Sequence, residues 1–223
     1  MGNAALRFAS YFPSDRLARL LYPETLAAWG SLAVVLVVVS ILVRMRATLA
    51  FDLRVTKYLQ EINVPLLSAA ARWSTFMGNS STLVVLAILG FGVSVWLKQA
   101  VAGIYLAASL FSLPLNVILK NIFDRERPGE KEVRVSPGPR WGFSFPSGHS
   151  MGSAAFYGWA AFLAALYIAD PNIRYPVVGL LLLLPFAVAL SRIYLGAHWL
   201  SDVVAGLAGG TLIVVMLASL YPV

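Results

Sequence analysis

The chain has 223 residues, of which 59% are hydrophobic and only 12% are charged, and its mean hydropathy is +0.78. A soluble domain carries about a quarter charged residues, so this composition excludes a conventional soluble enzyme, and a chain this apolar would collapse rather than stay disordered. The 17 Lys and Arg residues outnumber the 10 Asp and Glu residues, and the lack of cysteine excludes disulfides, thiolate metal sites and cysteine nucleophiles.

Six stretches poor in charge approach the roughly 20 residues that a helix needs to cross a bilayer. They predict transmembrane helices at residues 26–43, 80–97, 100–119, 150–169, 175–191 and 202–221. The expected fold is therefore all-α: a polytopic membrane protein with six transmembrane helices in a bundle, forming one domain over residues 1–223. The first 24 residues contain scattered arginines and no compact apolar run before a cleavage site, so we expect the first span to be an uncleaved anchor.

The segment between the first two spans has a helical pattern of its own. Apolar residues recur at helical spacing from Phe51 to Ile62, while Asp52 and three other charged residues fall on other faces. Pro65 interrupts this pattern, and a second apolar stripe continues to Met77. We predict two interfacial helices here, and we assign them no catalytic role.

Ionisable residues gather in three clusters, the first of which follows the third span. Lys120 and the pair Arg127–Pro128 place cations just beyond that helix, where a positive membrane flank is the simpler interpretation. Asn116 lies one helical turn before Lys120, which predicts that both side chains share a face directed into the bundle.

The second cluster is the run Pro146–Ser147–Gly148–His149, directly before the fourth span. A hydroxyl, a backbone without Cβ and the unpaired N–H groups of a helix start can together receive phosphate oxygens. The alternative is that Ser147 only caps the helix and His149 is a solvated bystander.

The third cluster contains Arg192, His198 and Asp202. On a helix starting near Ala197, His198 and Asp202 would share a face, so the carboxylate could accept a hydrogen bond from one imidazole nitrogen and raise the basicity of the other. Alternatively, the histidine and aspartate only satisfy each other at the membrane interface. Gly206 and Gly210, four residues apart in an apolar run, indicate a small-residue packing face.

The order and spacing of the clusters are more specific than any one of them. Lys-x6-Arg-Pro, then Pro-Ser-Gly-His, then Ser-Arg-x5-His-x3-Asp resemble the three signature motifs of the type 2 phosphatidic acid phosphatase family, whose integral-membrane members are lipid phosphate phosphatases. The resemblance includes the six-helix layout and covers a motif core of about residues 51–221.

The resemblance implies a role for each signature residue. It gives the substrate phosphate five ligands: Lys120, Arg127, Ser147, Gly148 and Arg192. His198 would be the nucleophile that forms a phosphohistidine, Asp202 would orient it, and His149 would protonate the leaving group. No metal or other cofactor is implied.

The leading hypothesis is hydrolysis of a lipid phosphomonoester or diphosphate, of the phosphatidate, phosphatidylglycerol phosphate or undecaprenyl diphosphate type. Two rivals stay open: a lipid-to-lipid phosphotransferase and a non-enzymatic phospholipid transporter. The expected partners are the lipid phosphate substrate and membrane lipids. Nucleic-acid binding is not expected, because the basic residues lie in short loops between spans, and no obligate protein partner is evident.

Two arguments about sidedness disagree. With six spans, five of the 17 cations lie on the side of both termini, which leaves twelve on the side of the motifs and favours cytoplasmic motifs. Bacterial members of the family that the sequence resembles commonly place the site outside the cytoplasm, and the arginines before the first span favour a cytoplasmic N-terminus. We expect a multi-pass protein of the cell inner (plasma) membrane with an extracytoplasmic active site and both termini cytoplasmic.

Overall fold

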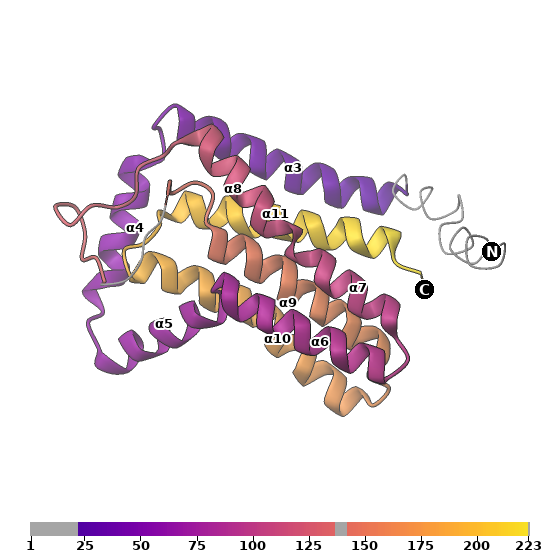
Figure 1. Ribbon diagram of the computed structural model, residues 1–223. Coiled ribbons are helices and arrows are strands. Elements are labelled where there is room, and N and C mark those ends of the chain that lie inside the picture. Colours follow the sequence, from indigo (N-terminus) through magenta and orange to yellow (C-terminus); the bar gives the residue numbers. More distant parts are fainter. Residues whose placement is uncertain (1–21, 137–141, 223) are drawn as a thin grey trace.

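The computed structural model describes residues 22–136 and 142–222, and every regular element within these ranges is helical. The all-α prediction is therefore confirmed for this part of the chain. Figure 1 shows long helices lying side by side, with α4 and α5 gathered at one end of the bundle. In chain order the elements are α3 (Pro23–Arg44), α4 (Leu49–Glu61), α5 (Pro65–Met77), α6 (Ser80–Trp96), α7 (Ala100–Ala108), the 3-10 turn η1 (Ser109–Phe111), α8 (Ser112–Phe123), α9 (Gly148–Tyr167), α10 (Pro171–Tyr194) and α11 (Leu200–Leu220).

All six predicted stretches are helical, but the count of six spans is not confirmed. Four segments of the described chain are long and apolar enough to cross a membrane, namely α3, the α7–α8 segment Ala100–Phe123, α10 and α11. A fifth is possible if α5 and α6, which meet at a 57° bend, form one span. α9 is absent from this set although it carries no charged residue, because Gly, Ser and His in its first turns lower its hydropathy.

α9 is the central helix of the bundle, which explains its composition. It packs against α10 and α11, and half of its residues are buried. Its apolar core includes Met151 and Trp159, which pack with Leu83 of α6 and Ile213 of α11. A helix covered by other helices needs small residues for close packing rather than a lipid-facing surface.

The predicted small-residue face of α11 is confirmed by its contact with α9. A Cβ atom added to Gly206 would lie 2.6 Å from the carbonyl oxygen of Ser147, and one added to Gly210 would collide with the carbonyl oxygen of Met151. The two backbones are so close that the Ser147 N–H donates to the carbonyl oxygen of Asp202 at 2.9 Å. The second and third motifs are thereby joined directly.

The two helices predicted between the first spans are present as α4 and α5, and α5 begins at Pro65 as expected. Asp52 lies on a different face of α4 from Phe51, as the pattern predicts. That face is the buried one: Asp52 is 1% exposed, whereas Phe51 beside it is 58% exposed. An ion pair with Arg125 accompanies this burial, since a buried carboxylate needs a cationic partner.

Candidate active site

The three motifs meet at the end of the bundle where α4 lies (Figure 1). Lys120 comes from the last turn of α8, Ser147 to His149 from the start of α9, and Arg192 from the last turn of α10. The remaining residues follow in the α8–α9 loop and around the start of α11. All eight predicted site residues therefore lie in the described part of the chain, and their helices bring them to one end of the fold.

His198 and Asp202 form the pair that the spacing predicts. His198 Nδ1 lies 3.3 Å from Asp202 Oδ2, and both side chains are at most 2% exposed. The helix itself begins later than expected, at Leu200 rather than near Ala197. Gly196 adopts a φ of +66°, which makes the turn before the helix, and the Trp199 N–H then donates to Asp202 Oδ2 at 2.9 Å.

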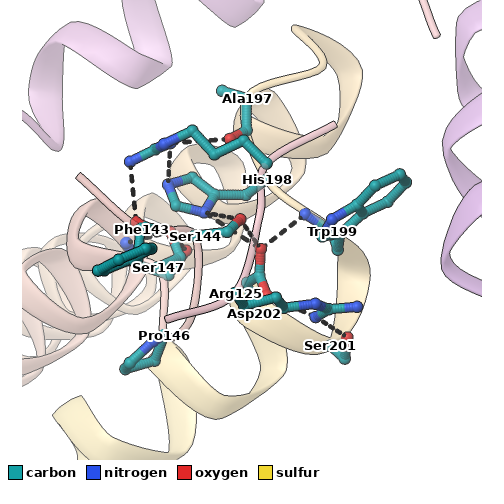
Figure 2. A network of polar contacts seen from close by, with 12 residues as sticks. Arg125, Phe143, Ser144, Pro146, Ser147, Ala197, His198, Trp199, Ser201 and Asp202 are labelled. Carbon is teal, nitrogen blue, oxygen red and sulfur yellow. Dashed lines mark hydrogen bonds and ion pairs between the residues drawn. The ribbon is translucent and has the colours of Figure 1, made fainter. Parts of the chain in front are cut away.

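Ser144 completes this pair and was not identified from the sequence. Its hydroxyl donates to Asp202 Oδ2 and lies 3.4 Å from His198 Nδ1, as Figure 2 shows. The only sequence signal was a polar residue two positions before the second motif, flanked by Phe143 and Phe145. The Asp202 carboxylate is thus held by donors on the side that faces the imidazole.

Arg127 lies over the other imidazole nitrogen. Its Nη1 is 3.1 Å from His198 Nε2 and donates to the carbonyl oxygen of Ala197 at 2.9 Å. The carbonyl oxygens of Gly142 and Phe143 accept from Nε and Nη2 at 3.0 and 3.2 Å. Because a guanidinium has only donors, Nε2 accepts here and carries no proton.

The charge state of His198 agrees with this geometry. Its burial, first of all, and the cations Arg192, Arg127 and Lys120 lower its pKa well below the ordinary value of 6.5, although a hydrogen bond involving Ser144 acts in the opposite direction. His198 is therefore neutral at pH 7, with its free electron pair on the nitrogen that faces the cations. A neutral, buried imidazole in a cationic pocket can attack an electrophile that carries negative charge.

The bend between α5 and α6 supplies two further polar partners that the sequence did not reveal. Asn79 Oδ1 lies 2.7 Å from His149 Nε2, and the Thr75 hydroxyl accepts a hydrogen bond from Arg192 Nη1. Thr75 and Asn79 are four residues apart in the sequence, and they lie on opposite sides of the bend. No motif marked them, because their partners are about 70 and 117 residues away.

Ser147 and Gly148 occupy the start of α9 in a way that favours the capping interpretation. The Ser147 hydroxyl oxygen accepts two hydrogen bonds from Ser150, one from its backbone N–H at 3.4 Å and one from the Ser150 hydroxyl at 3.0 Å. A Cβ at Gly148 would lie 2.7 Å from Asn116 Oδ1, and Asn116 Nδ2 donates to the carbonyl oxygen of Pro146 at 3.1 Å. Asn116 therefore points into the bundle as predicted, while phosphate binding by Ser147 and Gly148 stays a prediction.

Arg125 is a fourth residue from outside the predicted set. In the sequence it falls between the predicted site residues Lys120 and Arg127. In the structure it forms ion pairs with Asp202 and with the buried Asp52. Within residues 22–136 and 142–222, no group of three or more His, Asp or Glu side chains is placed to hold a metal ion.

Fold and site together define a class: a helical membrane protein with two histidines and several cations gathered at one end, a setting suited to an anionic group such as phosphate. Residues 82–222 match the family model of the PAP2 superfamily. The chain belongs to this superfamily, whose members are phosphatases that hydrolyse phosphate esters.

Two relatives are similar in sequence, one over most of the chain and one over part of it. Phosphatidylglycerophosphatase B of Bacillus subtilis (strain 168) is 28% identical over 188 residues, which cover 82% of this chain and 89% of the relative. The decaprenylphosphoryl-5-phosphoribose phosphatase of Mycolicibacterium smegmatis (strain ATCC 700084 / mc(2)155) is 36% identical over 90 residues, 40% of this chain and 43% of that protein.

Solved structures share the fold. The crystal structure of a transmembrane PAP2 type phosphatidylglycerolphosphate phosphatase from Bacillus subtilis superposes with a TM-score of 0.77 at 26% identity, covering 85% of this chain and 94% of the other. Aquifex aeolicus LpxE superposes with a TM-score of 0.57 at 21% identity, covering 74% and 93% of the two chains. The second likeness concerns the fold alone.

Proposed function

We propose that this member of the PAP2 superfamily is a membrane lipid phosphate phosphatase that works through a phosphohistidine on His198. The observation that carries the proposal is the position of this one side chain. His198 is buried, its Nδ1 faces Asp202, and its unprotonated Nε2 lies 3.1 Å from the Arg127 guanidinium.

The chemistry follows from these contacts. Nε2 of His198 attacks phosphorus while the bond to the leaving oxygen breaks, and Asp202 stabilises the positive charge that develops on the ring. Arg127 exchanges its contact with Nε2 for a phosphate oxygen, and Lys120 and Arg192 neutralise further charge on the oxygens.

The first half of the reaction needs an acid, and the second half needs a base. His149 gives a proton to the leaving oxygen, so the lipid departs as an alcohol or as a lipid monophosphate. Water then attacks the phosphohistidine and gives a proton to the deprotonated His149 while the P–N bond breaks, so inorganic phosphate leaves, His149 regains its proton and His198 regains its free electron pair. Neither half requires a metal ion, so the expectation of metal independence is part of the proposal.

The proposed substrate class is a phosphomonoester or diphosphate of a lipid. The names of the two relatives refer to phosphatidylglycerophosphate and to decaprenylphosphoryl-5-phosphoribose, which are both phosphorylated lipids. Phosphatidate, phosphatidylglycerol phosphate and undecaprenyl diphosphate are accordingly the compounds to test first. We place the protein in the cell inner membrane as a single domain, with the active site outside the cytoplasm and both termini inside.

The test is inorganic phosphate release by the purified, detergent-solubilised protein from these three lipids. We expect release from at least one lipid, inhibition by vanadate because it can adopt the five-coordinate geometry of phosphorus under attack, and full activity in EDTA. His198→Ala should abolish turnover, since it removes the nucleophile. Arg44→Met is the control, because Arg44 is an exposed arginine at the end of α3 whose ion pair is with the exposed Asp124.

Other outcomes would contradict parts of the proposal. A phosphorylated acceptor lipid without free phosphate would indicate a lipid-to-lipid phosphotransferase. Lipid movement between leaflets without any cleavage would indicate a transporter. Activity lost in EDTA and restored by magnesium would overturn the metal-free mechanism.

A further inference from the structure

Arg125 connects two buried carboxylates from distant parts of the chain. Its Nη1 donates to Asp202 Oδ1 at 2.6 Å, and its Nη2 donates to Asp52 Oδ2 at 2.7 Å. The Arg125 side chain is only 12% exposed, and the two aspartates are at most 1% exposed. Charge-assisted hydrogen bonds of this length between buried groups are among the strongest that proteins form.

Asp52 is itself fixed to the start of α11. Its Oδ1 accepts from the backbone N–H of Ser201 at 2.9 Å, and its Oδ2 accepts from the Ser201 hydroxyl at 2.6 Å. Ser201 directly precedes Asp202, so Asp52 and Arg125 contact adjacent residues in the first turn of this helix. α4, which the sequence analysis left without a catalytic role, is thereby joined to the residue that contacts His198.

The arrangement divides the two oxygens of Asp202 between two tasks. Oδ1 is taken by Arg125, while Oδ2 faces Ser144, the Trp199 N–H and His198 Nδ1. A buried carboxylate stays ionised only when a cation or several donors compensate it. Because Arg125 is shared with Asp52, the three groups carry a net charge of −1, so negative charge remains available to the imidazole.

We propose that Arg125, held by Asp52, is the positioning residue that keeps Asp202 ionised and directs Oδ2 at His198. This inference rests on the proposed function, in which Asp202 orients the nucleophile. Arg125 does not touch the substrate in this scheme, and it acts on the rate only through Asp202. It therefore differs from Arg127, which contacts His198 Nε2.

Two double-mutant cycles test the proposal, with kcat and KM measured for phosphate release from dioctanoyl phosphatidate and from para-nitrophenyl phosphate. Arg125→Met should lower kcat by about 10–100-fold with KM changed less than about threefold, as expected for a partner of a catalytic group. In an Asp202→Asn background the same change should cost less than about threefold, because the group that Arg125 positions is already absent.

The second cycle combines Arg125→Met with Asp52→Asn. Its variants all retain Asp202, so their activity is easier to measure than that of the Asp202→Asn variants. Asp52→Asn should lower kcat with little effect on KM, and the double variant should be no slower than Arg125→Met alone, within about threefold. Thermal unfolding of each variant checks that it folds, and Arg44→Met removes an exposed arginine at the end of α3 whose ion pair is with Asp124.

The outcomes separate this inference from the proposed function. Active wild type with inactive His198→Ala supports the phosphohistidine mechanism whatever Arg125 does. Given that result, equal fractional losses of kcat in both backgrounds, in either cycle, would show that Arg125 acts independently and would overturn the inference. A raised KM with unchanged kcat for Arg125→Met would do the same, since it would make Arg125 a substrate ligand.

Discussion

His198 combines deep burial with three nearby cations, and the two conditions act on its protonation in the same direction. Both lower its pKa below 6.5, so the neutral form that can attack phosphorus persists when the pH falls below the usual range for histidine. The residue thus stays reactive where an exposed histidine would already be protonated.

We predict that kcat/KM falls on the acid side with a midpoint below pH 6.5, once the ionisation of the substrate is taken into account. The position of this acid limb reports the pKa of a group in the free enzyme. Lys120→Met should move the limb to higher pH, because it removes one of the cations that lower the pKa of His198. The measurement is kcat/KM for para-nitrophenyl phosphate as a function of pH. A limb above 6.5 in the wild type, or a Lys120 variant that moves it to lower pH, would contradict this reading of the site.

Asn79 provides a second test at the residue scale. Since Asn79 Oδ1 lies 2.7 Å from His149 Nε2, Asn79→Ala should misorient the proposed acid and lower kcat for dioctanoyl phosphatidate by about tenfold. The loss should be much smaller for para-nitrophenyl phosphate, whose leaving group needs little help from an acid. Asn79→Asp, which keeps an acceptor oxygen, should lose less than Asn79→Ala. Equal losses on both substrates would argue against a role through His149.

The sequence predicted the signature residues well and their partners poorly, for a physical reason. His198 and Asp202 are four residues apart, so a short stretch of chain, the turn before α11 and the first turn of that helix, places them together. The partners Ser144, Asn79 and Arg125 reach the site across 54 to 77 residues of chain, and only the packed bundle brings them close. No local pattern can report such contacts.

At the scale of helices, the hydropathy pattern located the elements but did not establish which of them span the membrane. α9 lies among other helices, so its positions carry small and polar residues that a lipid-facing helix would not. α6 has only 17 residues and continues from α5 through a bend. In both cases the hydropathy of the sequence depends on whether a helix is covered by other helices or by lipid, and on whether a span is one helix or two.

The contact between α9 and α11 predicts a sharp difference between two glycines. Gly210→Ala should destabilise the protein by about 1–3 kcal/mol, because the new methyl group would collide with the Met151 carbonyl and the Ala154 side chain. Gly92→Ala in α6 is the matched control. An added Cβ meets nothing within 4 Å there, and alanine favours the helix by up to about 1 kcal/mol. Thermal unfolding in detergent compares the two. Equal stability of both variants would refute the tight contact.

At the scale of the whole molecule, the site lies at one end of the bundle, and α3 begins and α11 ends at the other (Figure 1). Which end faces the cytoplasm is a prediction from two conflicting arguments. Both arguments use the arginines before residue 22, and these lie outside the described residues.

A cysteine-free chain allows a direct test of orientation. We predict that Lys131→Cys, on the exposed loop near the site, reacts with a membrane-impermeant maleimide in intact cells, whereas a cysteine placed near the C-terminus does not. Both should react after the membrane is permeabilised, which controls for buried sites. Labelling of intact cells only near the C-terminus would place the motifs in the cytoplasm, as the count of cations indicates.

The position of the site at the end of the bundle has a consequence for the direction of the reaction. Under the proposed function, the dephosphorylated lipid is soluble only in the bilayer, whereas inorganic phosphate is soluble only in water. A site at the end of the helices lets the two products leave into different phases, where each is diluted separately. The reverse reaction would require both products to return to one pocket, so it would be slow while each product is dilute in its own phase.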